Sequence, residues 1–257
     1  MPVPSPLSSQ PFIHEGLADH AVLLVHGLGG GPYEVQRLAE ELHDAHGLTV
    51  QTLRLPGHEG PGPRMPASTW PEWYGAVRTA HTDLRARHPR VDLVGFSTGA
   101  MLVLHLAAEQ DVAGRLVLLA PFVRVRRPRL LPVAPETLVR ALAFVGSVPR
   151  LPPPLRDRAV RREVEGCAVY RTFNLDATRS ALALIDIVMA ELGEVRAPVL
   201  VVQGRRDTVV DPAGAELVYA RLAGDKRLLW VEGSDHLLTL DVGHGQVLRE
   251  VTGFLTA

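Results

Sequence analysis

The stretch VDLVGFSTGA, residues 91–100, places a serine between two glycines at the end of an apolar run. The residues before Ser97 are typical of a buried β-strand, and the AMLVLHLAAEQ run that follows is typical of a helix. A G-x-S-x-G sequence in this context predicts a sharp strand-to-helix turn that lifts the serine above the sheet, because the small residues leave room for it. The stretch therefore predicts an α/β fold with a nucleophilic serine at Ser97.

Apolar runs and helical patterns alternate along the chain on both sides of this stretch. The strand-like runs cover residues 21–27, 49–55, 91–97, 115–121, 197–204 and 227–233. The helical patterns cover residues 32–46, 70–88, 98–110, 212–223 and 242–256. Strands that are apolar throughout fit a parallel sheet covered by helices on both faces. The alternation therefore predicts one domain with a doubly wound, mostly parallel sheet.

The interval from Pro121 to Ala197 breaks this alternation. It holds about 75 residues, whereas a single crossover between strands needs roughly 25–35, so an insertion is expected there. Ten arginines between residues 124 and 162 give the insertion a local excess of positive charge. A solvated face is the expected role of these arginines, and attraction of an acidic substrate is the alternative.

The composition limits the classes of function. Basic residues number 27 and acidic residues 28, for a net charge of -1, so the total charge does not indicate nucleic-acid binding and we expect a small-molecule partner. Cys167 is the only cysteine, which excludes an intramolecular disulfide and is compatible with a reducing compartment, so a cytoplasmic location is expected. The amino terminus lacks a signal-peptide pattern, and no apolar run reaches the roughly 18 residues of a membrane helix, so no membrane insertion is expected. The first ten residues are expected to be disordered.

A serine hydroxyl is a weak nucleophile at neutral pH and needs two kinds of help. It needs a base within hydrogen-bond reach, and N–H donors where negative charge develops. The backbone N–H of Thr98, directly after the serine, is one expected donor. A second is expected from HGLGGGP at residues 26–32, because this loop follows an earlier strand-like run. The N–H of Leu28 is therefore the other expected donor.

The glycines of this loop have an alternative interpretation as a dinucleotide-binding fingerprint. That fingerprint requires a glycine where Pro32 stands and an acidic residue after the next strand, which ends in Arg54. The interpretation of this loop as the source of the second N–H donor is therefore favoured, and no organic cofactor is expected. His26 is interpreted as a residue that braces the loop.

The acid and the base of a catalytic triad follow the serine in the order Asp, then His, in enzymes with this type of turn. Asp207 lies just beyond one strand-like run, and His236 lies just beyond the next. We expect His236 to accept the Ser97 proton and Asp207 to hold the imidazole. Asp211 and Asp235 remain alternatives for the acid, although Asp211 is typical of a helix N-cap and Asp235 of a loop residue.

The remaining histidines and the cysteine are given structural interpretations. His105 is expected to be a hydrogen-bonded core residue, and Cys167 is expected to be an inert thiol. No nearby cluster completes a metal site around His43 and His46, so no metal is expected.

Together these residues make the sequence resemble the α/β-hydrolase superfamily, and more narrowly its small bacterial carboxylesterase and monoacylglycerol-lipase group. The resemblance covers most of residues 20–256 and is carried by HGLGGGP, LPGHE, GFSTG, APVLVVQGRRDTVVDP and SDHLLTLD. The chain differs from the pattern of that group in Ser234-Asp235 before the histidine, and in Ala100, where a second glycine is frequent. Neither difference is expected to abolish catalysis.

The resemblance implies a helical cap at residues 122–180 over the carboxyl edge of a core formed by residues 1–121 and 181–257. It implies six or seven strands, with the antiparallel strands that open larger hydrolases reduced to one around residues 12–14. It also implies cleavage of carboxylic esters through an acyl-enzyme on Ser97, without a metal or an organic cofactor.

The identity of the substrate is a separate expectation. Met101 and side chains of the cap are expected to border an apolar acyl pocket, which favours short- to medium-chain esters or monoacylglycerols. The same triad could act on a thioester, an amide, a lactone or a C–C bond beside a ketone, because one nucleophile and one oxyanion hole serve all of them. A non-catalytic hydrolase fold that binds a ligand is the alternative from another class. The sequence leaves the oligomeric state open.

Overall fold

Seven strands form the central sheet of the computed structural model, which describes residues 5–17, 19–59, 62, 64–110, 112, 114–128, 132–141, 144–167 and 170–257. The strands are β1 (Ile13–His14), β2 (His20–Val25), β3 (Thr49–Thr52), β4 (Arg90–Phe96), β5 (Leu116–Leu119), β8 (Val199–Gly204) and β9 (Lys226–Val231). Their spatial order is β1-β3-β2-β4-β5-β8-β9. All neighbours pair in parallel except β1, which pairs antiparallel with β3. The predicted mostly parallel sheet is confirmed, and β1 is the short antiparallel strand expected around residues 12–14.

The central strands are buried on both faces, as their continuous apolar sequences predict. Every residue of β5 and β8 is buried, and so is every residue of β2 and β4 except the first. β9 lies at the edge of the sheet and is partly exposed along most of its length. The core therefore lies on both sides of the central strands, which fixes the positions of the loops at their carboxyl ends.

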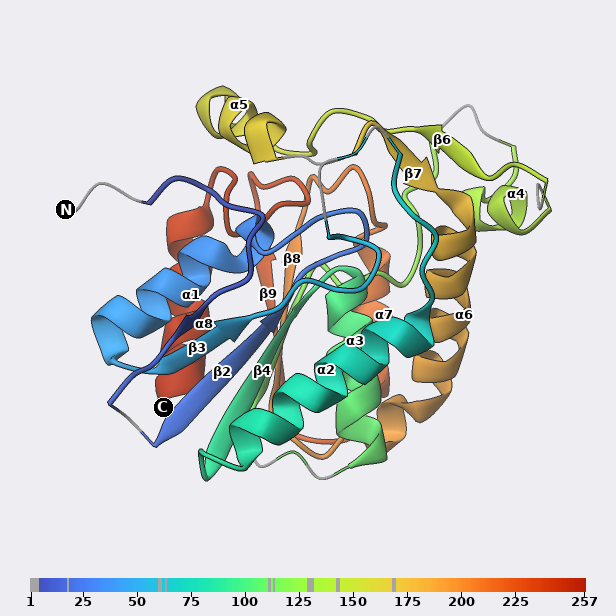
Figure 1. Cartoon of the computed structure of the whole chain (residues 1–257). Helices are drawn as coiled ribbons and strands as arrows, with labels where there is room; N and C mark the ends of the chain where they lie inside the picture. The colour runs from blue at the N-terminus through green and yellow to red at the C-terminus, as the bar shows by residue number, and fades with distance from the viewer. Residues whose placement is uncertain are drawn as a thin grey trace.

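Helices cover the two faces of this sheet (Figure 1). On one face α1 (Tyr33–His46) contacts α8 (His244–Thr256), and on the other α3 (Thr98–Glu109) contacts α2 (Trp70–Arg85) and α6 (Leu175–Glu191). The helix α7 (Ala213–Arg221) packs against β8 and β9, and the short 3-10 helix η1 (Leu192–Glu194) follows α6. Within the described ranges, none of the helices combines the length and the apolar character that a membrane crossing requires.

A separate group of short elements lies between β5 and α6 in the chain. It contains α4 (Pro135–Ala141), β6 (Ser147–Pro149), α5 (Arg158–Cys167) and β7 (Thr172–Asn174), and β6 pairs antiparallel with β7. Figure 1 shows these elements beyond one end of the large sheet, with α5 apart from α4, β6 and β7. Since α6 begins at Leu175 and packs on α3, the expected boundary between residues 180 and 181 falls inside a single helix. The division of the chain into a core and a cap stays a prediction.

The amino-terminal segment is ordered from residue 5 onward, which differs from the expected disorder. Leu7 is buried, its backbone N–H donates to Glu163 of α5, and the Cys167 thiol donates to its carbonyl oxygen. The N–H of Ser8 donates to Gln36 of α1 at 2.8 Å. The prediction was wrong for residues 5–10 because their partners lie far away in the sequence, and residues 1–4 lie outside the described ranges.

Candidate active site

Ser97 occupies a strained turn between β4 and α3. Its φ of 54° and ψ of -113° belong to a region that residues with a side chain rarely adopt. Three hydrogen bonds hold the turn, since the N–H of Ser97 donates to Leu119 of β5 at 2.8 Å and its carbonyl accepts from Ala100 at 3.1 Å and from Phe122 at 3.3 Å. The strain is maintained by the buried elements on either side, which is typical of a nucleophile held above a sheet.

The two glycines of the turn are required by close backbone contacts. A Cβ atom at Gly95 would lie 2.4 Å from the carbonyl oxygen of Gly99, and one at Gly99 would lie 2.4 Å from the carbonyl oxygen of Val25. No backbone tolerates such contacts without moving. The sequence G-x-S-x-G therefore reflects the space available between α3, β2 and β4.

We expect Gly99→Ala to lower the free energy of unfolding by about 1–3 kcal/mol, because overpacking of this size forces the backbone to shift. Urea denaturation measures the change. Gly253→Ala is the matched control, since Gly253 lies in α8 with no atom within 4 Å of the added Cβ. That control should be neutral or stabilising, because alanine favours a helix interior over glycine. Equal unfolding midpoints for both variants would contradict the expected crowding.

His236 and Asp207 form a buried pair at the ends of adjacent strands. Nδ1 of His236 lies 2.8 Å from Oδ2 of Asp207, which places the proton on Nδ1 and leaves Nε2 as the acceptor. The Asp207 carboxylate is held in turn by the N–H groups of Val209 and Val210, both at 2.8 Å, and by the Gln203 side chain at 3.0 Å. The histidine ring is thus fixed in one orientation and one tautomer.

Burial opposes the charged form of each partner, yet each partner favours the charge of the other. Burial raises the pKa of Asp207, but the adjacent His236 and the backbone N–H donors lower it by more than burial raises it, so the pKa lies below its ordinary value. Burial lowers the pKa of His236, but the Asp207 carboxylate raises it more, so the pKa lies above its ordinary value. The pair can therefore stabilise the imidazolium that forms when His236 accepts a proton.

The alternative acids have other contacts. One oxygen of Asp235 accepts hydrogen bonds from the N–H and hydroxyl of Thr208 and from the N–H of His236, which ties the two loops together. Asp211 accepts the N–H of Ala213 at the start of α7. The structure places Asp207, and neither alternative, against the imidazole of His236.

The loop after β2 passes directly beside the serine. A Cβ atom at Gly27 would lie 3.1 Å from Cβ of Ser97. The Gly27 carbonyl accepts Nδ1–H of His26 at 2.8 Å and the N–H of Gly30 at 3.2 Å. Because C=O and N–H point in opposite directions across a trans peptide, the N–H of Leu28 faces away from both donors.

Two backbone N–H groups are consequently available near Ser97. Thr98 is the first residue of α3, where an N–H has no acceptor within the helix. The N–H of Leu28 has no acceptor within the part of the chain that the structure describes. Both residues line the same cavity as Ser97 and His236. These are the two donors that the sequence predicts.

His26 and His58 brace this loop as neutral rings. Nε2 of His26 accepts the N–H of Leu55 at 3.0 Å, and Nε2 of His58 accepts the N–H of Gly29 at 2.8 Å. Burial, followed by the effect of His58, lowers the pKa of His26 to about 3. Since both ring nitrogens of His26 are engaged with the backbone, His26 is not available as a base.

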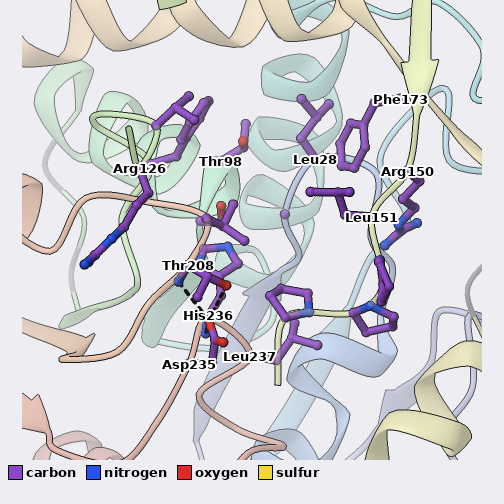
Figure 2. A pocket seen from close by; sticks show the side chains of 18 of the residues that line it. Leu28, Thr98, Arg126, Arg150, Leu151, Phe173, Thr208, Asp235, His236 and Leu237 are labelled. Carbon is purple, nitrogen blue, oxygen red and sulfur yellow. Dashed lines mark hydrogen bonds between the residues drawn. The ribbon is translucent and has the colours of Figure 1, made fainter. Parts of the chain in front are cut away.

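A cavity of about 700 Å³ has Ser97, His236, Leu28 and Thr98 in its wall. Most of the other lining residues are apolar: Phe96, Phe122, Val125, Val139, Val148, Leu151, Pro152, Pro153, Pro154, Val164, Phe173, Leu175, Val209 and Leu237. Figure 2 shows Leu28, Leu151 and Phe173 on one side of the cavity, and Thr208 and His236 on the other. A mostly apolar cavity in which the serine, the histidine and the two N–H groups share one wall is suited to an alkyl chain whose carbonyl end is held at those groups.

One expectation about the cavity was wrong. Met101, which was expected to border the pocket, is fully buried and is not part of the cavity wall. It lies one turn into α3, where the helix is already packed in the core. Three of the arginines expected on a solvated face, Arg126, Arg150 and Arg161, line the cavity, where Arg126 is exposed as expected and the other two are half-buried.

Two further residues that lie against the loop after β2 were not predicted as site residues. Glu34, which the sequence suggests only as an acid that suits the start of a helix, is a buried acid in the cavity wall. Phe173 lies so close to Gly29 that a Cβ atom there would be 2.7 Å from its ring. Neither residue carries a local signal, since their positions depend on contacts made across the chain.

Several lipases and esterases are similar to this chain over nearly its whole length. It is 26% identical to a thermostable monoacylglycerol lipase of Bacillus sp. (strain H-257), over 96% of this chain and 94% of that protein. It is 25% identical to a carboxylesterase of Bacillus subtilis (strain 168), over 97% of both chains. A solved structure from work on LipS and LipT, two metagenome-derived lipolytic enzymes, superposes with a TM-score of 0.85 at 27% identity, covering 97% of this chain and 98% of that one. The structure of the Paleococcus ferrophilus monoacylglycerol lipase, at 22% identity and a TM-score of 0.81 over 96% and 97% of the two chains, shares the fold.

A family model covers most of the chain. The matching family is Hydrolase_4, described as serine aminopeptidase, S33, and the match runs over residues 16–243. These residues include the serine turn, the loop of Leu28, Asp207 and His236. With its α/β-hydrolase fold and this match, the chain belongs to the Hydrolase_4 family of serine hydrolases.

Proposed function

We propose that this protein is a carboxylester hydrolase that works through an acyl-enzyme on Ser97. The observation that carries the proposal is the shared location of four features in one apolar cavity. These features are the strained serine, His236 with Asp207 buried behind it, and the free N–H groups of Leu28 and of Thr98. The similarity to lipases and carboxylesterases supports the same conclusion.

In the first half of the reaction, the Ser97 hydroxyl oxygen attacks the carbonyl carbon of the ester. Nε2 of His236 accepts the hydroxyl proton, and the imidazolium is stabilised by Asp207. The carbonyl oxygen becomes an oxyanion that accepts hydrogen bonds from Leu28 and Thr98. When the oxyanion collapses, the C–O bond to the alcohol breaks, and the alcohol leaves with the proton of His236.

In the second half, a water molecule replaces the alcohol. His236 removes a proton from the water, the resulting hydroxide attacks the acyl-enzyme, and the same two N–H groups hold the second oxyanion. The bond to Ser97 then breaks, the serine oxygen takes the proton back, and the carboxylic acid is released. The cycle uses only side chains and N–H groups of the chain itself.

The apolar lining supports short- to medium-chain esters or monoacylglycerols as substrates. An alkyl chain gains about 0.8 kcal/mol for each methylene that moves from water into such a lining. The near-zero net charge supports a small-molecule substrate in preference to a nucleic acid, and the single cysteine supports a cytoplasmic location.

A series of p-nitrophenyl esters from acetate to palmitate tests this function. We expect kcat/KM to rise with chain length by up to about fourfold for each methylene, because each buried methylene is worth about 0.8 kcal/mol. The rise should end between butyrate and decanoate, where the cavity is filled. Preference for charged or very bulky acyl groups would contradict the proposed lining, and inactivity on every ester would contradict ester hydrolysis itself.

The description of the family as a serine aminopeptidase makes an amide the matched counter-substrate. An aminopeptidase needs a free carboxylate for the substrate ammonium group. Glu34 and Asp235 line the cavity, but Glu34 already accepts the N–H of Gly27, and Asp235 already accepts hydrogen bonds from Thr208 and from the N–H of His236. We therefore expect no detectable turnover of an alanine p-nitroanilide under conditions in which p-nitrophenyl butyrate is hydrolysed.

A further inference from the structure

Glu34 is a carboxylic acid buried against the loop after β2, which carries the N–H donor of Leu28. It lies in the first turn of α1, only 6% exposed, and lines the same cavity as Ser97. Its Oε2 accepts the N–H of Gly27 at 2.8 Å. Its Oε1 lies so close to Gly30 that a Cβ atom there would be 2.1 Å away. The carboxyl group therefore contacts the loop at two points, one before and one after Leu28.

These contacts help to fix the peptide bond between Gly27 and Leu28, which carries the N–H donor. Glu34 holds the N–H of Gly27, and His26 and Gly30 hold the carbonyl oxygen of Gly27. Both ends of this residue are thus fixed, and its carbonyl belongs to the peptide that carries the N–H of Leu28. A donor that is already aimed where charge develops needs no reorganisation during the reaction.

Several charged or titratable groups face Glu34 from other elements. Burial raises the pKa of Glu34 to about 7, against the opposing effects of the Gly27 N–H, of Arg150 beside β6, and of His236 after β9. Tyr33 is its neighbour on α1, where Glu34 contributes to a raised pKa of the phenol. Arg150 also donates to the carbonyl of Gly29 at 2.6 Å, so the short elements between β5 and α6 contact the same loop.

Glu34 and His236 line the same cavity, and the hydroxyl of Thr239, three residues after His236, donates to the backbone carbonyl of Glu34. The electrostatic influence between these two neighbours is mutual. Burial lowers the pKa of His236, while Asp207 first and Glu34 next raise it, with Asp235 adding to them. A negative charge on Glu34 therefore favours the imidazolium that exists during proton transfer. An acid at a helix N-terminus usually acts on its own helix from the surface, whereas this acid is buried between the loop and the base.

Resting on the proposed ester hydrolysis, we propose that Glu34 is a positioning residue: it fixes the direction of the Leu28 N–H through Gly27 and supports the charged form of His236. Two variants separate the hydrogen bond to Gly27 from the negative charge near His236. Glu34→Gln keeps an oxygen acceptor for Gly27 and loses the charge. Glu34→Ala loses both.

The test compares these variants in a kcat and KM measurement on p-nitrophenyl butyrate across pH. We expect Glu34→Ala to lower kcat by about 10- to 100-fold with little change in KM, because a misaligned oxyanion donor acts on the transition state. We expect Glu34→Gln to keep most of kcat. Its acidic limb of kcat/KM should move to lower pH, since His236 loses a neighbouring negative charge and its pKa falls.

Glu216→Gln is the matched control, because Glu216 is an exposed acid in the first turn of α7 and is not part of the cavity wall. It should leave kcat, KM and the acidic limb unchanged. Thermal melting of each variant accompanies the kinetics, and if Glu34→Ala does not fold, the pH profile of Glu34→Gln decides. An unmoved acidic limb in Glu34→Gln together with unchanged kcat in Glu34→Ala would overturn the proposal. So would equal loss of kcat in both variants with an unmoved limb, which indicates a structural role only.

A fluorophosphonate separates this proposal from the proposed function. Ser97 forms an O–P bond, the P–F bond breaks, fluoride leaves, and the serine proton passes to His236. The labelling rate depends on the base and on the oxyanion donors, whatever the natural substrate is. If the wild type hydrolyses no ester but is labelled, the proposed function fails, and the labelling rates of the Glu34 variants across pH still decide the role of Glu34.

Discussion

Replacing Ser97 with alanine is expected to reduce kcat on p-nitrophenyl butyrate by roughly 10⁴-fold or more, with the fold intact. The hydroxyl is the only group of the proposed site that forms a bond to substrate. Without it, the N–H groups of Leu28 and Thr98 can polarise the ester, but water must attack directly. Initial rates over a range of ester concentrations measure the loss, and circular dichroism checks the fold.

Ser147→Ala is the control for this substitution. Ser147 is an exposed residue of β6 that is not part of the cavity wall, so its hydroxyl should not matter for turnover. Labelling of the wild type by a fluorophosphonate, and its absence in Ser97→Ala, tests the nucleophile by a second route. Turnover by Ser97→Ala at the wild-type rate would remove Ser97 from the mechanism.

Replacing Asp207 with asparagine should have the second largest effect, a loss of about 10³- to 10⁴-fold in kcat. The asparagine oxygen can still accept the N–H groups of Val209 and Val210, so its NH₂ group would face Nδ1 of His236. The imidazole would then carry its proton on Nε2, which could no longer accept the Ser97 proton. The loss arises from the wrong tautomer in a site that keeps its shape.

The kinetics of Asp207→Asn are measured from neutral to alkaline pH beside two controls. Asp211→Asn affects only the start of α7 and should change kcat little. Asp235→Asn disturbs the contact between the loops of Thr208 and His236, so a smaller loss is expected. If Asp207→Asn stayed within tenfold of the wild type while Asp235→Asn lost more, the acid would have to be assigned to Asp235.

Several parts of the site were predictable because each depends on a short stretch of chain. An apolar run followed by a glycine-flanked serine predicts the turn at Ser97, and the observed helix begins at Thr98. The positions of Asp207 and His236 follow from two strand-like runs that end at the same edge of a parallel sheet. The structure places their side chains 2.8 Å apart.

Other features could not be predicted because they depend on how distant segments pack. Arg150 contacts Gly29 across 121 residues of chain, and Leu7 contacts Glu163 across 156. No local pattern distinguishes Glu34 from a glutamate in the first turn of an exposed helix. Its burial comes from the loop after β2 and from the short elements between β5 and α6. Met101 was misplaced for the same reason, since helical spacing does not reveal which face of α3 meets the cavity.

Local sequence patterns are enough to predict which runs are buried strands, where the serine turn lies, and which Asp and His follow the last two strands. These features are local because backbone preference and burial pattern are set over a few residues. The folded chain is needed to see which side chains line the cavity, which peptide N–H groups stay free, and that a buried acid contacts the loop that carries Leu28. Those features depend on the packing of segments that are separated along the chain, and packing is set by shape and by hydrogen-bond satisfaction among all of them at once.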